Sequence, residues 1–280
     1  MVYWDTFHSR LDVTADLVAK TALRVGVGGE AAEPTATDLP VLKNPDGQPF
    51  IPGSSLRGVL RSHVERIVRT LESPGTNGRG SCVPVVESEG CVTSRQMSQW
   101  REKVRQRSRE KREKESDDLW LARHVWEKSC RVCRVFGSPW LASRVRIADL
   151  HPNGVVRTEV RDGVSIHRDK GTVENKYDFE TVPAETRFRL FIAAENLEKE
   201  ERGLLWLGVR ELERGYIHLG GFKGRGLGHV KLESLTLRGV ESEDRPALRA
   251  YLLEGHLSTI PLETADGWLT SLVNVLEGGA

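Results

Sequence analysis

The residues of this chain whose spacing most directly suggests chemistry are its four cysteines, Cys82, Cys91, Cys130 and Cys133. The last two form the motif CRVC, a C-x-x-C knuckle that lets two thiolates reach one metal ion. In a reducing compartment, cysteines grouped as two pairs favour zinc over disulfides. We therefore expect a structural zinc site; unrelated free thiols are the alternative. Should one cysteine not ligate, a histidine could replace it, and the candidates are His63, His124 and His151.

A second candidate is the glycine-rich stretch GGFKGRGLGHV, which spans residues 220–230 and carries five glycines and two cations. It is not a P-loop, because Lys223 is followed by Gly224 and no Ser or Thr comes after the lysine. It also fails the dinucleotide-binding pattern, since His229 stands where the third glycine would be. A bare main chain beside Lys223 and Arg225 is suited to a phosphate backbone. The alternative is a simple turn between a helix and a strand.

The elements that would carry these residues begin with alternating apolar and polar segments at 7–20 and 22–28, which predict strands. Residues 26–53 contain glycine, proline and a DG turn signal and predict a long loop, which in a compact domain is usually functional. An amphipathic helix is predicted over 54–73, with Ser54 or Ser55 as its N-cap. Its apolar stripe consists of Leu56, Val59, Leu60, Val64, Ile67, Val68 and Leu71, and its other face carries Arg57, Arg61, Arg66 and Arg69.

The middle of the chain reads as an insertion over residues 73–133, which contains all four cysteines. Within it, residues 101–116 hold eight cations and four acids, which predicts a solvated helix, with a nucleic-acid-binding arm as the alternative. Further along, we predict strands at 144–150, 186–196 and 229–239, a protruding hairpin within 160–183, and helices at 201–215 and 267–278.

Strands alternating with two crossing helices predict an α+β fold of the ferredoxin-like, RRM-like type, built from residues 1–72 and 134–280. Such a fold exposes a sheet face and suits RNA-binding modules. Hydrophobic residues at 38% and charged residues at 29% of 280 are typical of a soluble globular protein. No apolar run approaches the roughly 20 residues of a membrane span, so we expect a cytoplasmic protein without membrane contact. The net charge of +1 means that nucleic-acid affinity must come from local patches.

Three segments in the same order along the chain resemble the RAMP superfamily of CRISPR RNA-binding proteins, and most closely the backbone subunit of type III effector complexes. They are TDLPVLKNPDGQPFIPGSSLRGVLR, CRVCRVFGS and GGFKGRGLGHV. The stretch SIHRDKGTVENKYDFETVPAETRFRLFI also resembles the family segment that enters the guide-target duplex. The resemblance implies a ferredoxin-like RAMP core, and copies of the subunit along a CRISPR guide RNA with a complementary target RNA opposite it and other subunits of the complex as partners.

By this resemblance, the helix N-terminus and the glycine loop would contact guide phosphates. Free N–H groups, the helix dipole and cations one turn apart support an anion site at that helix end. The alternative for the two arginines is a solvated helix face. The implied RNA-binding residues are Ser54, Ser55, Arg57, Arg61, Gly221, Lys223, Gly224 and Arg225.

The resemblance also implies a catalytic aspartate, Asp38, in the loop before PGSS. With Mg²⁺ or another divalent cation, a carboxylate there would cut the target RNA by ligating the metal or helping to deprotonate the attacking 2′-hydroxyl. Leu39 follows it where the family often has asparagine, and a turn-capping aspartate is the alternative. Rivals for the same role are Glu30, Glu33 and Asp46.

Three functions are therefore open: a guide-binding subunit that cleaves target RNA at Asp38, the same subunit as a non-catalytic scaffold, and a guide-processing endoribonuclease. The last class often uses histidines, and this sequence offers no obvious pair among His8, His63, His124 and His167.

Overall fold

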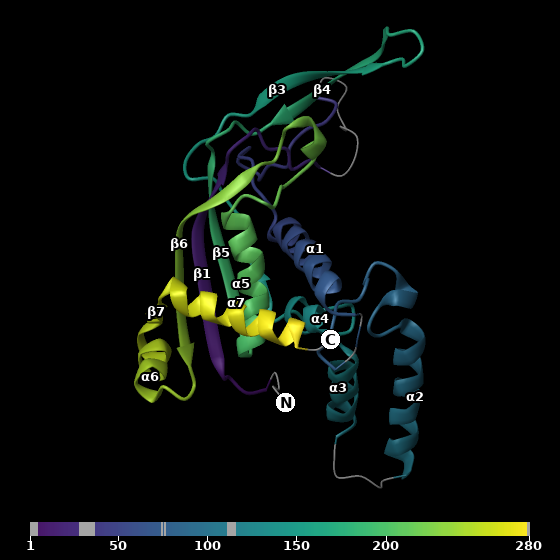
Figure 1. Ribbon diagram of the computed structural model, residues 1–280, viewed down its shortest axis with the longest axis vertical. Coiled ribbons are helices and arrows are strands. Elements are labelled where there is room, and N and C mark those ends of the chain that lie inside the picture. Colours follow the sequence, from purple (N-terminus) through teal and green to yellow (C-terminus); the bar gives the residue numbers. More distant parts are fainter. Residues whose placement is uncertain (1–4, 28–36, 74, 76, 111–115, 279–280) are drawn as a thin grey trace.

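The computed structural model describes residues 5–27, 37–73, 75, 77–110 and 116–278, and Figure 1 shows the course of the chain. None of the helices in these ranges is both long and apolar enough to cross a membrane. The elements in chain order are β1 Ser9–Ala19, α1 Gly53–Leu71, the 3-10 turn η1 Glu87–Glu89, α2 Ser94–Glu110, α3 Asp117–Lys128, α4 Arg131–Phe136, β2 Val145–Ile147, β3 Glu159–Ile166, β4 Val173–Thr181, β5 Arg187–Glu195, α5 Lys199–Glu213, the 3-10 turn η2 Lys223–Arg225, β6 Val230–Glu241, α6 Arg245–Glu254, β7 Ser258–Ile260 and α7 Leu262–Glu277.

The centre of the fold is an antiparallel sheet with the strand order β2-β5-β1-β6-β7. β1 pairs with β5, where Val13 lies opposite Ile192, and with β6, where Leu17 lies opposite Leu232. Alternate residues of β1 are apolar and buried, as the two-residue period of a strand requires. The chain order β1-α1-β2-β5-α5-β6, with β1 and β5 central, is a ferredoxin-like βαββαβ unit. The predicted fold class is confirmed.

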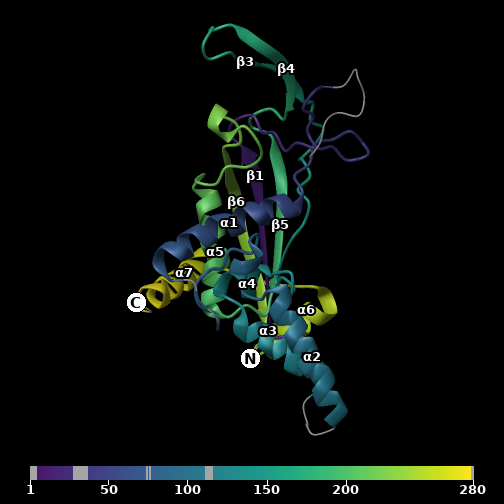
Figure 2. The ribbon, with the colours of Figure 1, turned by 90° about the vertical axis from the view of Figure 1, so that its right-hand side faces the viewer.

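Helices α1 and α5 cover one face of this sheet (Figures 1 and 2). The predicted stripe of α1 points to the core: Leu56, Leu60, Val64 and Val68 are all fully buried. Only the last member of the stripe departs from the prediction, because Leu71 at the helix end is 45% exposed. Helix α7 packs in turn on α5 and extends the core.

Helix α1 begins at Gly53 and its N-cap is Pro52, so the prediction of Ser54 or Ser55 as N-cap is wrong. The reason lies in another part of the chain. The Asp149 carboxylate, just past β2, accepts the Gly53 N–H at 2.8 Å and takes over the capping role. Both serines therefore lie in the first helical turn, with exposed side chains.

The predicted strand over 22–28 is also wrong, because its described residues make only isolated bridges, from Leu23 to Val182 and from Gly26 to Val41. The segment crosses between two different partners, so no continuous ladder forms. Residues 144–150, likewise, contain only the short strand β2. The sequence predictions missed α3, α4, α6 and β7, while the predicted C-terminal helix is present and starts earlier, at Leu262.

Two parts project from opposite ends of the molecule (Figures 1 and 2). One is the predicted hairpin, formed by β3 and β4 with Val160 opposite Glu180. The other is the helix pair α2 and α3, whose described side chains over 101–106 are largely exposed, as predicted for a solvated helix. The boundaries 73 and 133 of the insertion stay a prediction. A second apolar cluster lies at this end and consists of Val92, Met97, Trp100, Val125 and Leu141.

Candidate functional site

The loop that carries Asp38 is tied to the base of the β3–β4 hairpin. The Asp38 N–H donates to Asp178 Oδ1 at 2.7 Å, and the Asp178 N–H donates to Asp38 Oδ2 at 3.0 Å. The next residue continues the pairing, since Leu39 bridges Phe179 in parallel and its carbonyl accepts the Glu180 N–H at 3.0 Å. The Asp38 side chain stays exposed. It is thus held at a fixed position with one carboxylate oxygen, Oδ1, without a partner among the described residues.

The buried carboxylate of Glu180, in β4, also holds the Asp38 loop. It accepts hydrogen bonds from the Val41 N–H at 3.1 Å, from Lys43 Nζ at 2.5 Å and from the Thr158 hydroxyl. Burial alone would raise the pKa of this carboxyl group. The hydrogen bonds outweigh burial and hold the pKa of Glu180 below its ordinary value. The carboxylate therefore stays ionised. It connects strand β4 of the hairpin to the Asp38 loop, through Val41 and Lys43, and to Thr158, which directly precedes β3.

The glycine loop, residues 220–230, is folded back on the chain rather than extended. Gly220 has φ +75°, and a Cβ there would lie 2.1 Å from the Arg24 carbonyl oxygen, so the backbone approach itself requires glycine. Phe222 also has a left-handed backbone, at φ 58°. The turn η2 follows, and it presents Lys223, Gly224 and Arg225 to solvent.

A small aromatic cluster joins the glycine loop to the Asp38 loop and the hairpin. The Phe222 ring meets the Phe179 ring edge to face at 4.9 Å, and Arg24 lies over Phe222 at 5.1 Å. Arg225 donates to the Tyr177 hydroxyl on the hairpin. All three segments, far apart in the sequence, thus meet above the amino-terminal end of α1 (Figure 1). The members of the cluster are Ala22, Leu39, Tyr177, Phe179, Phe222 and Leu227.

The first turn of α1 faces the glycine loop across a cavity of about 430 Å³. Ser54 and Ser55 line one side, and Gly221 and Lys223 line the other. Neither serine hydroxyl has a partner among the described residues. Four of the predicted RNA-binding residues are therefore brought together, with Gly224 and Arg225 next to them on the same turn.

The other two predicted RNA-binding residues point elsewhere. Arg57 donates to the Phe136 carbonyl. Arg61 donates to the Gly137 carbonyl at 2.7 Å and to Cys133 Sγ at 3.3 Å, and forms an ion pair with Glu65. Both guanidinium groups thus contact α4 and the glycine after it. Their contact with guide phosphates stays a prediction.

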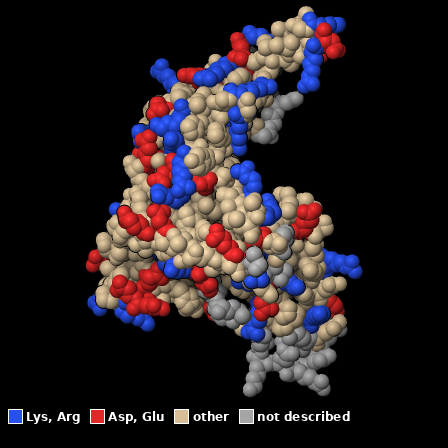
Figure 3. Space-filling model, in the orientation of Figure 1, with Lys and Arg blue, Asp and Glu red and all other residues tan. Residues whose placement is uncertain are grey.

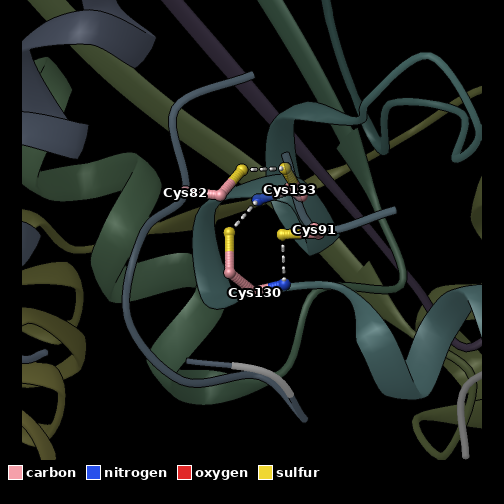
Figure 4. A group of neighbouring side chains, drawn as sticks. All are labelled: Cys82, Cys91, Cys130 and Cys133. Atoms are coloured by element: carbon pink, nitrogen blue, oxygen red, sulfur yellow. Dashed lines mark hydrogen bonds between the residues drawn. The ribbon is translucent and has the colours of Figure 1, made fainter. Parts of the chain in front are cut away.

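The four cysteines converge beside α4, where Cys82 and Cys91 meet Cys130 and Cys133 of the CRVC motif (Figure 4). Their Sγ atoms all lie within 4.8 Å of one another, and those of Cys82 and Cys133 are 3.5 Å apart. Cys130 caps the short helix α4, where its sulfur accepts the Cys133 N–H at 3.5 Å. The CRVC motif therefore forms the first turn of α4, with Cys130 as its N-cap and Cys133 inside the helix.

This arrangement can hold a metal ion. Tetrahedral zinc with Zn–S bonds of about 2.3 Å spaces its sulfurs about 3.8 Å apart, close to the observed clustering. Hydrogen bonds from the Cys133, Cys82 and Cys91 thiols lower the pKa of the Cys130 thiol, which favours the thiolate that a metal needs. The substitute histidines are engaged elsewhere: His63 with Glu211, His124 on the Trp120 ring, and His151 on Phe50.

On the uncovered face of the sheet, cations near the point where β1 ends and β5 begins are paired with acids. There Arg187 pairs with Glu233 at 2.6 Å and with Asp16 at 3.6 Å, and Lys20 pairs with Glu233 at 3.0 Å. Figure 3 shows Lys and Arg side chains interspersed with acidic ones along the hairpin arm and around the concave side beneath it.

Several partners in this region were missed by the sequence predictions. Asp178, Tyr177 and Arg24 contact the predicted site residues, yet no local motif marks them. Of the rivals to Asp38, Asp46 lies in an exposed turn between Asn44 and Gln48. The other two, Glu30 and Glu33, lie outside the described residues.

Fold and site together define a ferredoxin-like α+β protein. Its basic glycine loop precedes strand β6, and the loop that carries Asp38 lies beside it. The chain belongs to the RAMP superfamily, whose family model matches residues 16–231.

Two curated proteins, both called CRISPR system Cms endoribonuclease Csm3, are similar to parts of the chain. The one from Methanothermobacter thermautotrophicus is 30% identical over 77 residues, which cover 27% of this chain and 31% of that protein. The one from Mycobacterium tuberculosis is 34% identical over 62 residues, which cover 22% of this chain and 26% of that protein. The matched parts thus span about a third or less of each relative.

Proposed function

We propose that this protein is a guide RNA-binding backbone subunit of a type III CRISPR complex that cleaves complementary target RNA. Its membership of the RAMP superfamily and the printed names of the two relatives support this function. The observation that carries it is the convergence of three features at one end of the core: the serine turn of α1, the basic glycine loop and the exposed Asp38 carboxylate. Its partners would be guide RNA, target RNA, other subunits and further copies of itself.

Guide phosphates would bind between the first turn of α1 and the glycine loop. The unpartnered hydroxyls of Ser54 and Ser55 can donate hydrogen bonds to an anion there, next to the Asp149 carboxylate that already accepts the Gly53 N–H at the same helix end. Lys223 and Arg225 add charge across the cavity, and Gly221 and Gly224 let a backbone approach closely. Arg57 and Arg61, by their contacts with α4, would hold the helix in position for this binding.

Cleavage of the target strand would depend on Asp38, which the hairpin holds beside the glycine loop. Oxygen donors suit Mg²⁺, and Asp38 Oδ1 and Asp178 Oδ2 have no hydrogen-bond partner among the described residues, so these two carboxylates fit a hard divalent cation. Such a cation, when bound, supplies charge stabilisation at the scissile phosphate. The Asp38 carboxylate would orient it or accept the proton of the attacking 2′-hydroxyl.

The four cysteines would bind structural zinc. Their role would be to hold the predicted insertion on the core, because all four cysteines lie in it and Cys133 contacts Arg61 of α1. The metal would contribute to stability and not to the cleavage chemistry.

The decisive test is cleavage of a guide-complementary RNA by the assembled complex with Mg²⁺. We expect Asp38→Ala and Asp38→Asn to bind target normally and to lose cleavage about 100-fold or more at the positions that this subunit serves. Asp38→Asn keeps an acceptor for the Asp178 N–H, so it separates the charge from the loop geometry. Asp46→Ala, an exposed carboxylate in a nearby turn, is the matched control.

Two outcomes would assign the chain differently. An unchanged cleavage pattern in Asp38→Ala would make this subunit a non-catalytic scaffold. Cutting of a repeat hairpin by the isolated chain would instead indicate a guide-processing endoribonuclease.

A further inference from the structure

The cavity between the glycine loop and α1 continues along the helix. A second cavity, of about 580 Å³, adjoins the first, and Gly58, Val59 and Lys223 line both. Together they form one groove, which runs from the serine turn to the fifth turn of α1, where Arg69 lies. Its far part is lined by Ser62, His63, Arg66, Arg69, Tyr216 and His218.

The chemistry of the far part fits a nucleotide. Its described lining contains cations and histidines but no acidic side chain. Arg66 is exposed and Tyr216 is 65% exposed, although a phenol ring of this size usually packs against the protein. An exposed aromatic ring beside cations is the combination that binds the base and the phosphate of single-stranded RNA.

Gly58 gives an independent indication that something outside the chain occupies the groove. It lies in the interior of α1, where glycine destabilises a helix by about 1 kcal/mol relative to alanine. No packing requires it, because a Cβ at this position would have nothing within 4 Å. The empty space opens onto the groove floor between the two cavities. Because Gly58 has no side chain, the backbone of a ligand can pass close to the helix at this point.

We propose that this groove carries the guide strand past the glycine loop, over Gly58, to a nucleotide subsite where the base stacks on Tyr216 and Arg66 contacts the phosphate. The inference rests on the proposed function, because it assumes that the first cavity binds guide RNA. Arg66 is already oriented by His63, whose Nδ1 lies 3.1 Å from Arg66 Nη2 while its Nε2 lies 3.1 Å from Glu211.

The test measures binding of the full chain to a fluorescein-labelled single-stranded oligouridine. Gly58→Ala and Gly58→Leu are compared with Gly267→Ala and Gly267→Leu, a matched control in α7 where a Cβ also meets nothing within 4 Å. Both alanine variants should fold at least as stably as the wild type. We expect affinity to fall with side-chain size at position 58 and to stay constant at position 267.

The subsite itself is tested at two side chains. Tyr216→Ala should weaken binding roughly 5- to 100-fold, whereas Tyr216→Phe, which keeps the ring, should bind nearly as the wild type does. Arg66→Gln should reduce the slope of log affinity against log salt by about 0.7. Equal binding by Gly58→Leu and Gly267→Leu, or an unchanged affinity of Tyr216→Ala, overturns the inference and leaves the proposed function standing. A wild-type chain that binds no RNA overturns both.

Discussion

Asp38 and Asp178 exchange backbone-to-carboxylate hydrogen bonds, at 2.7 and 3.0 Å, across 140 positions of sequence. Each aspartate fixes the main chain of the other, so the loop and the hairpin position Asp38 jointly. The proposed catalytic carboxylate therefore depends on the hairpin for its place. Asp178 positions the Asp38 loop through Oδ1, and its Oδ2 is the second carboxylate oxygen that fits the proposed divalent cation.

The first prediction concerns Asp178. Asp178→Ala removes the acceptor of the Asp38 N–H and frees the loop, so we expect target cleavage to fall roughly 10- to 100-fold, as for a catalytic group displaced by about 1 Å. Guide binding should be unchanged. Asp178→Asn retains an acceptor and should recover part of the activity. Single-turnover cleavage by the assembled complex measures this, and equal rates for Asp178→Ala and the wild type would contradict it.

The second prediction is a pH dependence centred on Glu180. Its pKa is lower in the folded protein than its ordinary value of 4.5, so the unfolded chain binds the proton more readily. The stabilisation is therefore complete above about pH 4.5 and is lost as the pH falls through the folded pKa. We expect the protection factor of the Val41 amide, whose N–H donates to Glu180, to fall in that acid range when exchange is compared with the intrinsic rate at each pH.

Glu180→Gln should lower stability by about 2 kcal/mol near neutral pH, because charge-assisted hydrogen bonds are replaced by weaker ones. It should also flatten the dependence of stability on pH below about 4.5. Glu174→Gln, an exposed glutamate on the same strand, is the control. If the acid dependence is the same in both variants, Glu180 is not its source.

The third prediction concerns zinc. We expect one zinc ion per chain, and a zinc-selective chelator, with Mg²⁺ kept in excess, should increase hydrogen exchange over residues 80–135 while β1 and β5 stay protected. A complex assembled beforehand should continue to cleave target RNA. Cys133→Ser should reproduce the effect of the chelator. A metal content well below one zinc per chain would rule out the site.

The fold was largely predictable because its signals are local and periodic. Leu56, Leu60, Val64 and Val68 repeat at helical spacing, and their burial follows from that period. The cysteine cluster was predictable for a different reason, since a C-x-x-C knuckle together with a second cysteine pair is the usual pattern of a shared metal site. These features need no knowledge of distant partners.

What could not be predicted depends on distant partners. The helix cap was misassigned because Asp149, 96 positions away, accepts the Gly53 N–H. The segment 22–28 alternates like a strand, yet its bridging partners Val41 and Val182 lie on different parts of the fold. Arg61 has the position of a solvated or RNA-binding cation in a helical projection. Only the tertiary contacts reveal the carbonyl and the thiol that it meets.

The last prediction separates the two roles of Arg61. Its guanidinium binds Glu65, the Gly137 carbonyl and Cys133 Sγ, and its side chain is 15% exposed. Arg61→Ala leaves the buried Glu65 with only the more distant Arg69, at 3.8 Å, so we expect a loss of stability of about 3 kcal/mol. The salt dependence of guide binding should remain unchanged, because the charge that it removes does not face the groove.

Lys223→Ala is the matched comparison, since Lys223 is exposed on the cavity wall. It should keep the wild-type stability and reduce the salt slope of guide binding by about 0.7. Thermal unfolding and binding titrations at several salt concentrations measure both quantities for each variant. A reduced slope in Arg61→Ala with unchanged stability would mean that Arg61 turns away from α4 to bind the guide backbone. The structure predicts the opposite, because turning would leave both Glu65 and the Gly137 carbonyl without their closest donor.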